Sequence, residues 1–293
     1  MSMTIGVVGL GLIGGSIAKA LKSNSGHRVI GFDADWDVLE NALRLEAIDG
    51  FIEDENLEEC DMLIVALYPK ATVDYITVKA PRLRKGCIVL DCCGVKQGVC
   101  ASLETLSKEH GFWFVGGHPM AGIEKSGFYN SDADLFQGAS LILTPYDWTP
   151  ENVVDIVAEV GRTLGFARIQ FATPERHDEM IAYTSQLAHV VSCAYVTSPL
   201  ATDFYGFSAG SFRDMTRVAI LNDVMWSELF IENREYLCGE IDSLAERLKE
   251  LSSAIRNGDR EQLRGLLQTA TEIKTSIEEN AMLGWPRRGG MCS

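Results

Sequence analysis

The sequence predicts an α/β protein in which an N-terminal doubly wound parallel sheet is followed by an all-helical domain. Short β-branched runs alternate with helical segments from residue 4 to about residue 171, a pattern typical of a parallel sheet with helices on both faces. Beyond residue 173, apolar residues recur only at helical spacing. The 293 residues are enough for about two domains. We therefore expect a first domain over residues 1–173 and a second over residues 174–293.

Composition and charge argue against several classes of protein. With 26 Lys+Arg against 41 Asp+Glu, the formal net charge is −15, which argues against a nucleic-acid partner. No stretch reaches the ~18 apolar residues that a membrane span requires, and the N-terminus lacks the basic start of a secretory signal. The eight cysteines include no CxxC pair, so reduced thiols are expected. We predict a cytoplasmic protein with neither a membrane nor a nucleic-acid partner.

The first predicted strand, IGVV, runs directly into a glycine-rich turn and then into a helix-prone segment, SIAKALK. Gly9 permits a tight turn, Gly11 lets the backbone approach a pyrophosphate, and Gly14 allows the helix to pack closely. Leu12 and Ile13 open the helix, whose unpaired N–H groups attract phosphates. The G-x-G-x-x-G pattern in this strand–turn–helix setting predicts a Rossmann-type dinucleotide site.

The second predicted strand, RVIGFD, ends in Asp33, 19 residues after Gly14. At about this distance from the glycine turn, an acidic side chain accepts hydrogen bonds from the cofactor's ribose hydroxyls. A carboxylate there repels a 2′-phosphate, and no arginine follows in the next three residues, so NAD is favoured over NADP. The alternative is that the glycines serve only a tight strand–helix turn.

Five further apolar runs complete the predicted sheet: MLIVALY, CIVLDCC, WFVGGH, ASLILTP and ARIQFA. Ligands of doubly wound sheets bind at the carboxyl ends of the strands, so the polar residues that follow CIVL and WFVG are candidates. Lys96 belongs to the first of these loops and His118 to the second. His118 is placed for a general base, because the ordinary pKa of histidine lies near neutral pH. A structural histidine is the alternative.

The sheet domain is predicted to end with a helix over residues 151–164, which Gly165 is placed to terminate, and with one more strand. Thr173 and Pro174 then form a strong helix start, because threonine caps helices well and proline suits the first helical turn. This change of pattern sets the predicted domain boundary.

Two long amphipathic helices are predicted for the remainder of the helical domain. Apolar residues recur at three- and four-residue intervals over residues 233–255, and a break at Gly258 precedes a last helix that extends to about residue 280. Such stripes fit either an intramolecular core or a dimer interface. We expect a homodimer formed through this domain.

The helical domain also carries two pairs of polar residues at helical spacing. Gln186 and His189 are three residues apart, and Arg213 and Arg217 are four apart, so each pair shares a face. Two such arginines commonly belong to a solvated surface. A protein of charge −15 that binds an anion nevertheless needs a local cationic pocket, and arginine matches carboxylates well. His177, at the start of this helical region, is expected to be an ordinary helix residue.

Five segments together resemble the prephenate dehydrogenase family: GLGLIGGS, GGHPMAGIEKSGF, LFQGASLILTP, TSQLAHVVSCAY and FRDMTRVA. The resemblance covers nearly the whole chain. It implies that His118 is the catalytic histidine that hydrogen-bonds the ring hydroxyl of the substrate and that Glu124 shapes and gates the site. It also implies that His189 contacts the substrate and that Arg217 binds a substrate carboxylate, with Arg213 nearby.

The expected substrate site also includes Lys96 and Gln186, and two positions depart from the family pattern. Gly94 stands where many members carry a serine, so a hydroxyl that would assist His118 is absent. Gln186 stands where a first histidine is usual. Both departures concern the proton relay and the substrate preference rather than the fold.

The reaction implied by the resemblance is the NAD-dependent oxidative decarboxylation of prephenate to 4-hydroxyphenylpyruvate in tyrosine biosynthesis. It needs no metal, because the forming ring ketone is the electron sink and the protein supplies positioning, proton removal and anion binding. Three alternatives stay open. The first alternative is that the substrate is arogenate. The second is a 3-hydroxy-acid dehydrogenase, which would usually rely on a lysine in the helical domain. The third is a non-catalytic NAD-binding regulator.

Overall fold

A computed structural model describes residues 2–207 and 210–282 of the protein. Among these residues, those up to Leu237 form one compact unit and those from Cys238 onward form a second. Seven cysteines are free thiols, and Cys292 lies outside the described residues. No helix in the two described ranges is both long and apolar enough to cross a membrane.

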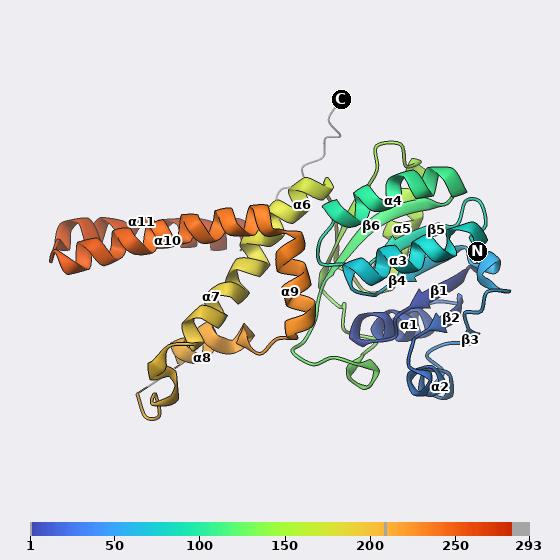
Figure 1. The fold of residues 1–293 in the computed structure, drawn as a ribbon, viewed down its shortest axis with the longest axis horizontal. Coiled ribbons are helices and arrows are strands. Elements are labelled where there is room, and N and C mark those ends of the chain that lie inside the picture. The colour runs from blue at the N-terminus through green and yellow to red at the C-terminus, as the bar shows by residue number, and fades with distance from the viewer. Residues whose placement is uncertain (1, 208–209, 283–293) are drawn as a thin grey trace. The chain divides into compact units, whose positions relative to one another are not determined.

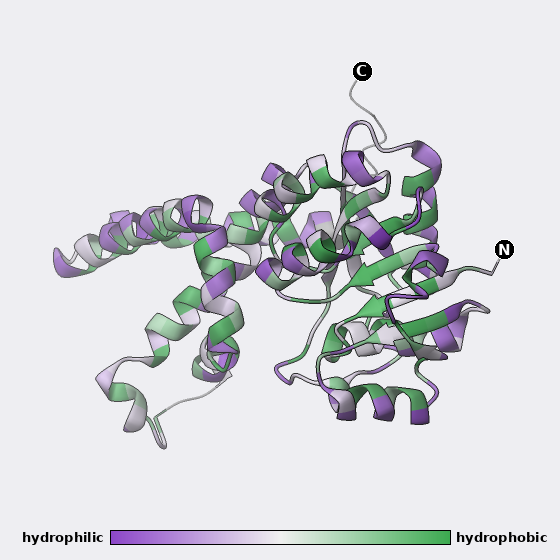
Figure 2. Cartoon of the chain, turned by 45° about the vertical axis from the view of Figure 1, so that its right-hand side comes forward, coloured by the Kyte–Doolittle hydropathy of each residue, from purple (hydrophilic) through white to green (hydrophobic). Residues whose placement is uncertain are grey.

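A sheet of eight strands forms the centre of the first unit, as far as the chain is described, in the order β3-β2-β1-β4-β5-β6-β7-β8. Strands β1 to β6 are labelled in Figure 1. The strands are largely hydrophobic (Figure 2), as expected for a sheet with both faces covered. Neighbours pair in parallel except β6 and β7, which are antiparallel. The predicted doubly wound sheet is thus confirmed, with one reversal. The strands are β1 (Thr4–Val8), β2 (Arg28–Phe32), β3 (Gly50–Phe51), β4 (Met62–Val65), β5 (Ile88–Asp91), β6 (Trp113–Met120), β7 (Ser140–Pro145) and β8 (Arg168–Phe171).

Two hydrophobic cores cover the two faces of the sheet. Successive residues of β1 point to opposite faces: Val7 packs in the core that includes α1, α2 and α5, and Val8 packs in the core that includes α3 and α4. Each fully buried aliphatic side chain of these cores stabilises the fold by about 1.5–3 kcal/mol. The helices are α1 (Leu12–Asn24), α2 (Trp36–Arg44), α3 (Pro69–Lys79), α4 (Gln97–His110) and α5 (Glu151–Thr163).

Strand β6 extends beyond its parallel neighbour. Its pairing with β5 ends at Val115, whereas its pairing with β7 continues to Met120 and places His118 opposite Ile142. His118, which the sequence predicts at the end of the strand WFVGGH, therefore lies inside β6, because the antiparallel β7 supplies backbone partners past the end of β5. This extension carries His118 to the carboxyl end of the parallel strands.

The rest of the first unit is helical. The Thr173 side chain caps its first helix by accepting a hydrogen bond from the Arg176 amide at 3.2 Å, as the sequence predicts. A π-helical turn, Ala182–Gln186, joins α6 to α7. We propose that the functional domains meet at residue 173, where strands give way to helices. The helices are α6 (Pro174–Ile181), α7 (Leu187–Val196), α8 (Gly210–Thr216) and α9 (Asp223–Glu232).

The second unit consists of two long helices. Helix α10 (Arg234–Arg256), which starts in the first unit, and α11 (Arg260–Met282) run antiparallel and side by side (Figure 1). Gly258 joins them with a φ of +65°, a conformation that favours glycine. The two amphipathic helices and the break between them agree with the sequence prediction.

Candidate active site

The glycine turn between β1 and α1 has the geometry of a phosphate-binding turn. Gly9 has a φ of +82°, and a Cβ there would lie 2.6 Å from the Ala66 carbonyl oxygen, so a side chain would be strained. A Cβ at Gly14 would lie 1.9 Å from the Gly9 carbonyl oxygen. At Gly11, by contrast, no described atom lies within 4 Å of such a Cβ. The turn is therefore packed from behind and open where a pyrophosphate would approach.

Leu12 and Ile13 form the start of α1, next to this turn. The N-cap residue Gly11 offers no side chain to hydrogen-bond the amides of the first helical turn. These N–H groups are consequently available to a phosphate, which the positive end of the helix dipole also favours.

Asp33 lies beside the same turn. Its carboxylate accepts hydrogen bonds from the Leu10 amide at 2.7 Å and from the Asp35 amide at 3.0 Å. These bonds fix the carboxylate, and its remaining lone pairs can accept from ribose hydroxyls. The glycine turn, the helix start and Asp33 together fit a dinucleotide such as NAD.

His118 of β6 and His177 and Asp178 of α6 form a hydrogen-bonded relay. His118 Nδ1 lies 2.8 Å from His177 Nε2, and His177 Nδ1 lies 2.7 Å from Asp178 Oδ1. Because the carboxylate accepts, His177 Nδ1 donates to it, and the neutral ring then accepts at Nε2. His118 Nδ1 therefore carries the proton, and His118 Nε2 keeps a free lone pair, as a general base requires.

The start of α4 holds Asp178 in place. The Lys96 amide donates to Asp178 Oδ1 at 2.8 Å, and the Gln97 amide donates to Oδ2 at 2.9 Å. A carboxylate is favourable at this end of a helix. His177 and Asp178 are each 1% exposed, whereas His118 is half-buried. The relay is thus shielded from water except at His118.

Burial keeps both histidines of the relay neutral. Desolvation by burial lowers the pKa of His118 well below its ordinary value, because a second cation beside His177 and Lys96 is unfavourable. Desolvation also lowers the pKa of His177, although Asp178 opposes this shift. Neutral histidines near physiological pH are what the assigned proton positions require.

Lys96 lies in the interior and not at the surface of the site. Its ammonium group pairs with Asp91, and both side chains have no exposed area. Asp91 also accepts from the amides of Gly117 at 3.0 Å and Cys93 at 2.8 Å. Although burial lowers it, the pKa of Lys96 is raised overall by the Asp91 carboxylate. The predicted contact of Lys96 with a substrate is not supported, because a fully buried ion pair already uses the ammonium group.

Gln186 is likewise used inside the protein. It is 1% exposed. Its Nε2 donates to the Leu229 carbonyl at 3.2 Å, and its Oε1 accepts from Asn233 Nδ2 at 2.7 Å. Both ends of the amide are occupied, so the predicted contact of Gln186 with a substrate is not supported either.

Gly94 leaves a space beside the base. A Cβ at this position would lie 3.9 Å from His118 Nε2 and 3.3 Å from Leu229 Cδ2. Leu229 of α9 therefore borders the space that a serine hydroxyl would occupy. His118 Nε2 faces this space with no side-chain hydroxyl from residue 94.

Helix α9 also contacts His189 of α7. The Trp226 ring stacks on the His189 ring, with centroids 3.8 Å apart. His189 Nδ1 lies 2.9 Å from the Ser185 carbonyl oxygen and donates to it, which leaves Nε2 free. Burial lowers the pKa of His189, and the charge of Arg217 lowers it further, against the Ser185 hydrogen bond. The turn Arg217–Ala219 packs against α7, so Arg217 and His189 lie on neighbouring elements.

Glu124 and Arg217 form an ion pair. Arg217 Nη1 lies 2.5 Å from Glu124 Oε1, and both side chains are exposed. Arg213 is exposed on α8, one turn before Arg217, and makes no ion pair among the described residues. The structure therefore places Glu124, Arg217 and His189 of the predicted set on contacting elements, and among the described residues Arg213 makes no ion pair or side-chain hydrogen bond with them.

The sequence prediction missed the relay residues. His177, expected to be an ordinary helix residue, instead contacts His118, and Asp178 and Asn233 were not singled out. The histidine–aspartate pair at a helix start was a visible signal. Its partner lies 59 residues earlier, so the contact becomes evident only once β6 and α6 are placed.

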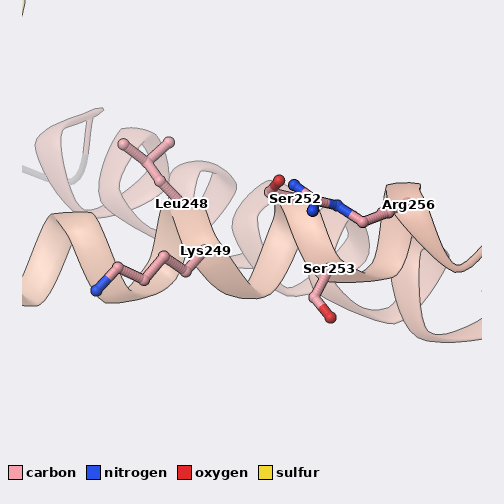
Figure 3. Close-up of a pocket in the computed structure, with 5 residues that line it drawn as sticks. All are labelled: Leu248, Lys249, Ser252, Ser253 and Arg256. Atoms are coloured by element: carbon pink, nitrogen blue, oxygen red, sulfur yellow. The ribbon is translucent and has the colours of Figure 1, made fainter.

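Two other kinds of site come into question in the described part of the chain, a metal centre and a surface hollow. No group of three or more His, Cys, Asp or Glu residues there could hold a metal ion. A hollow on α10 contains no histidine or carboxylate and so no counterpart of the relay (Figure 3). It is lined by Leu248, Lys249, Ser252, Ser253 and Arg256, all from one helix.

Comparisons with known proteins match both the sheet and the helical part of the chain. The family profile described as prephenate dehydrogenase, nucleotide-binding domain, matches residues 17–170, and the profile described as prephenate dehydrogenase, dimerization domain, matches residues 173–269. The cyclohexadienyl dehydrogenase of Zymomonas mobilis is 32% identical over 264 residues, which cover 87% of this chain and 89% of that protein.

Two solved structures have the same fold over almost their whole length. One is a prephenate dehydrogenase from A. aeolicus in complex with hydroxyphenyl propionate and NAD+, with a TM-score of 0.83 and 28% identity, covering 94% of this chain and 99% of that chain. The other is an arogenate dehydrogenase from Synechocystis, with a TM-score of 0.81 and 26% identity, covering 94% of this chain and 100% of that chain.

Proposed function

Since this chain belongs to the prephenate dehydrogenase family, we propose that it oxidises prephenate with NAD and releases 4-hydroxyphenylpyruvate and carbon dioxide. The observation that carries this proposal is the free lone pair of His118 Nε2. His177 and Asp178 orient it, at the same end of the sheet as the glycine turn. A base and a dinucleotide site at one sheet edge are what a dehydrogenation requires.

The cofactor that we propose is NAD. Asp33 supports this choice, because its carboxylate is fixed beside the glycine turn and would repel the 2′-phosphate of NADP. When bound, the oxidised nicotinamide accepts a hydride from the ring carbon that bears the substrate hydroxyl. Gly11 and the first turn of α1 would hold the pyrophosphate.

His118 would manage the proton of the reaction. Its Nε2 takes the proton from the ring hydroxyl as the carbinol becomes a ketone. The ring carboxylate then leaves as carbon dioxide, and the electrons of its carbon–carbon bond aromatise the ring and leave a phenolate. The His118 cation can return its proton to that oxygen. Aromatisation makes the step irreversible.

Arg217 and His189 would bind a carboxylate of the substrate. Arg217 is paired with Glu124 at 2.5 Å, so a substrate carboxylate would replace Glu124 as the partner of the guanidinium group. Such an exchange conserves a charge-assisted hydrogen bond while it releases the loop that carries Glu124. This arrangement supports the gating role that the family resemblance implies for Glu124.

Arogenate is the second candidate substrate, and the similarity to the Synechocystis arogenate dehydrogenase favours keeping it. Arogenate differs from prephenate in the ring side chain, which carries an amino acid in place of a keto acid. The deciding experiment follows NADH formation with prephenate and with arogenate, each with NAD and NADP. Turnover of prephenate with NAD supports the proposal. Turnover of arogenate alone reassigns the side-chain pocket, and NAD binding without turnover favours the regulator.

We also propose that the protein is a homodimer formed through its helical domain. The match to a dimerization domain over residues 173–269 supports this proposal. So do large apolar side chains that are more than half exposed on α10 and α11, among them Leu248, Ile255 and Ile273. Two copies would cover these faces from water.

A further inference from the structure

A buried pair of amides braces the junction between α6 and α7. Asn233 Nδ2 donates to the Asp178 carbonyl at 2.9 Å and to Gln186 Oε1 at 2.7 Å, and Gln186 Nε2 donates to the Leu229 carbonyl at 3.2 Å. Asn233 and Gln186 are 2% and 1% exposed. The bonds span the π-helical turn Ala182–Gln186, a feature that often accompanies functional sites.

Packing alone does not explain an asparagine at this position. Two acceptors face its nitrogen, so the orientation of the amide is fixed and the nitrogen is the donor. Asn233 Oδ1 is buried and has no hydrogen-bond partner among the described residues. A buried unpaired carbonyl destabilises a fold, and an apolar side chain of similar size would avoid this penalty. The two donated hydrogen bonds are therefore the property that distinguishes asparagine here.

Asn233 and Gln186 connect to both sides of the candidate site. The carbonyl of Asp178 is held by Asn233, while its carboxylate holds His177, which in turn accepts from His118. In the other direction, Gln186 holds the Leu229 carbonyl of α9, and the Leu229 side chain borders the space beside His118.

We infer that Asn233 and Gln186 are positioning residues that act through Asp178 and Leu229 to hold His118 in its productive orientation and proton state. This inference rests on the proposed dehydrogenase function of the same site. Neither residue touches the substrate. Their loss is expected to lower kcat and to leave cofactor binding intact, because the glycine turn and Asp33 are separate from this network.

The test uses Asn233→Leu in the full-length protein. This substitution removes both donated bonds and the unpaired oxygen without adding charge, but it leaves the buried Gln186 Oε1 without its donor, so Tm is expected to fall. We expect kcat to fall by about 10–100-fold, equivalent to about 1.4–2.8 kcal/mol, with an unchanged Kd for NAD. In the free protein, the ¹⁵N NMR signals of His118 are expected to change from a single Nδ1–H tautomer to a mixture.

Further variants keep the inference testable if Asn233→Leu does not fold. Gln186→Met keeps the length of the side chain but neither donates to the Leu229 carbonyl nor offers Asn233 its amide oxygen, so the same losses are expected. Gln186→His, whose neutral ring keeps one acceptor and one donor, should stay within about threefold of the wild-type kcat at pH 8.5, since 0.65 kcal/mol is about threefold. Ser192→Ala is the matched control, because Ser192 is equally buried and its hydroxyl has no partner in the described residues.

A folded Asn233→Leu or Gln186→Met protein with wild-type kcat or wild-type His118 signals would overturn the inference. The NMR measurement needs no substrate. If the wild-type protein oxidises neither prephenate nor arogenate, the proposed function is refuted. A changed His118 tautomer in the Asn233→Leu variant would still support the positioning role.

Discussion

The proton state of His118 is set by a single acceptor, Asp178, which His118 does not touch. Asp178 forces His177 to donate from Nδ1, and His177 then accepts from His118. Two helix-start amides hold the carboxylate. The start of α4 thus fixes Asp178, and through His177 it determines which nitrogen of His118 carries the proton.

Replacing His118 by asparagine tests its role as the base. Asparagine keeps a polar group but cannot take a proton, so kcat is expected to fall by about 10²–10⁴-fold. The Kd for NAD, measured by calorimetry, should stay unchanged because the glycine turn is untouched. His110→Asn at the end of α4 serves as the histidine control. A His118→Asn variant with wild-type kcat would show that another group removes the proton.

The two relay histidines should also make stability depend on pH. Burial lowers both pKa values below the ordinary value of about 6.5. As the pH falls below about 6.5, the unfolded chain binds protons that the folded protein does not, so the free energy of unfolding decreases. Urea denaturation at several pH values from 7.5 to 5.5 measures this slope. The slope should be smaller in a His118→Asn/His177→Asn variant, and equal slopes would contradict the assignment of neutral histidines.

Substitution of Arg217 should affect binding more than chemistry. Arg217→Met removes the proposed partner of a substrate carboxylate, and a hydrogen bond to a charged group contributes about 1.5–3 kcal/mol, which corresponds to a KM raised by roughly 10–100-fold. Steady-state kinetics separates KM from kcat. Arg176→Met is the matched control, since Arg176 is an exposed arginine paired with Glu179. A fall in kcat at constant KM would assign Arg217 to the transition state instead.

At the scale of elements, the strand–turn–helix unit was the most predictable part of the molecule. Its signal is local, because glycine spacing, the flanking strand and the helix start all lie within a short stretch of chain. The reversal between β6 and β7 was not predictable, because parallel and antiparallel strands can have the same apolar pattern. The same holds for the burial of Lys96 and Gln186, whose partners Asp91, Leu229 and Asn233 are set by tertiary packing.

Two substitutions in the glycine turn should separate folding from cofactor binding. Gly14→Ala places a methyl group 1.9 Å from the Gly9 carbonyl oxygen, so both Tm and NAD affinity should fall. Gly11→Ala meets no described atom within 4 Å, so Tm should hold while NAD affinity falls by about tenfold or more, equivalent to about 1.4 kcal/mol. Thermal unfolding and calorimetry check both. Unchanged NAD affinity in Gly11→Ala would place the pyrophosphate elsewhere.

At the scale of the whole molecule, the two structural units divide the chain differently from the predicted domains. The boundary between the two compact units follows Leu237, whereas the sequence predicts a functional boundary at residue 173. The difference arises because α6 supplies His177 and Asp178 to a relay with β6, and α9 contacts Gly94. The fold class and the family were predicted correctly, and the extent of these contacts required the structure.

The proposed homodimer leads to a test on α10. Leu248→Glu/Ile255→Glu introduces charge on the side chains that a partner would bury, so light scattering should show the mass of a single chain where the wild type shows twice that mass. Val78→Glu on α3, an equally apolar and exposed position, should leave the mass unchanged. A wild-type protein of single-chain mass at micromolar concentration would rule out the dimer.

The extension of β6 past β5 bears on the order in which a newly synthesised chain acquires its nucleotide site and its catalytic base. A ribosome releases the glycine turn and Asp33 first, and their strands β1, β2 and β4 pair with one another without later residues. The segment that holds His118 pairs only with β7 and then needs His177. A nascent chain therefore gains its nucleotide-binding half early and its oriented base only after residue 178 has emerged.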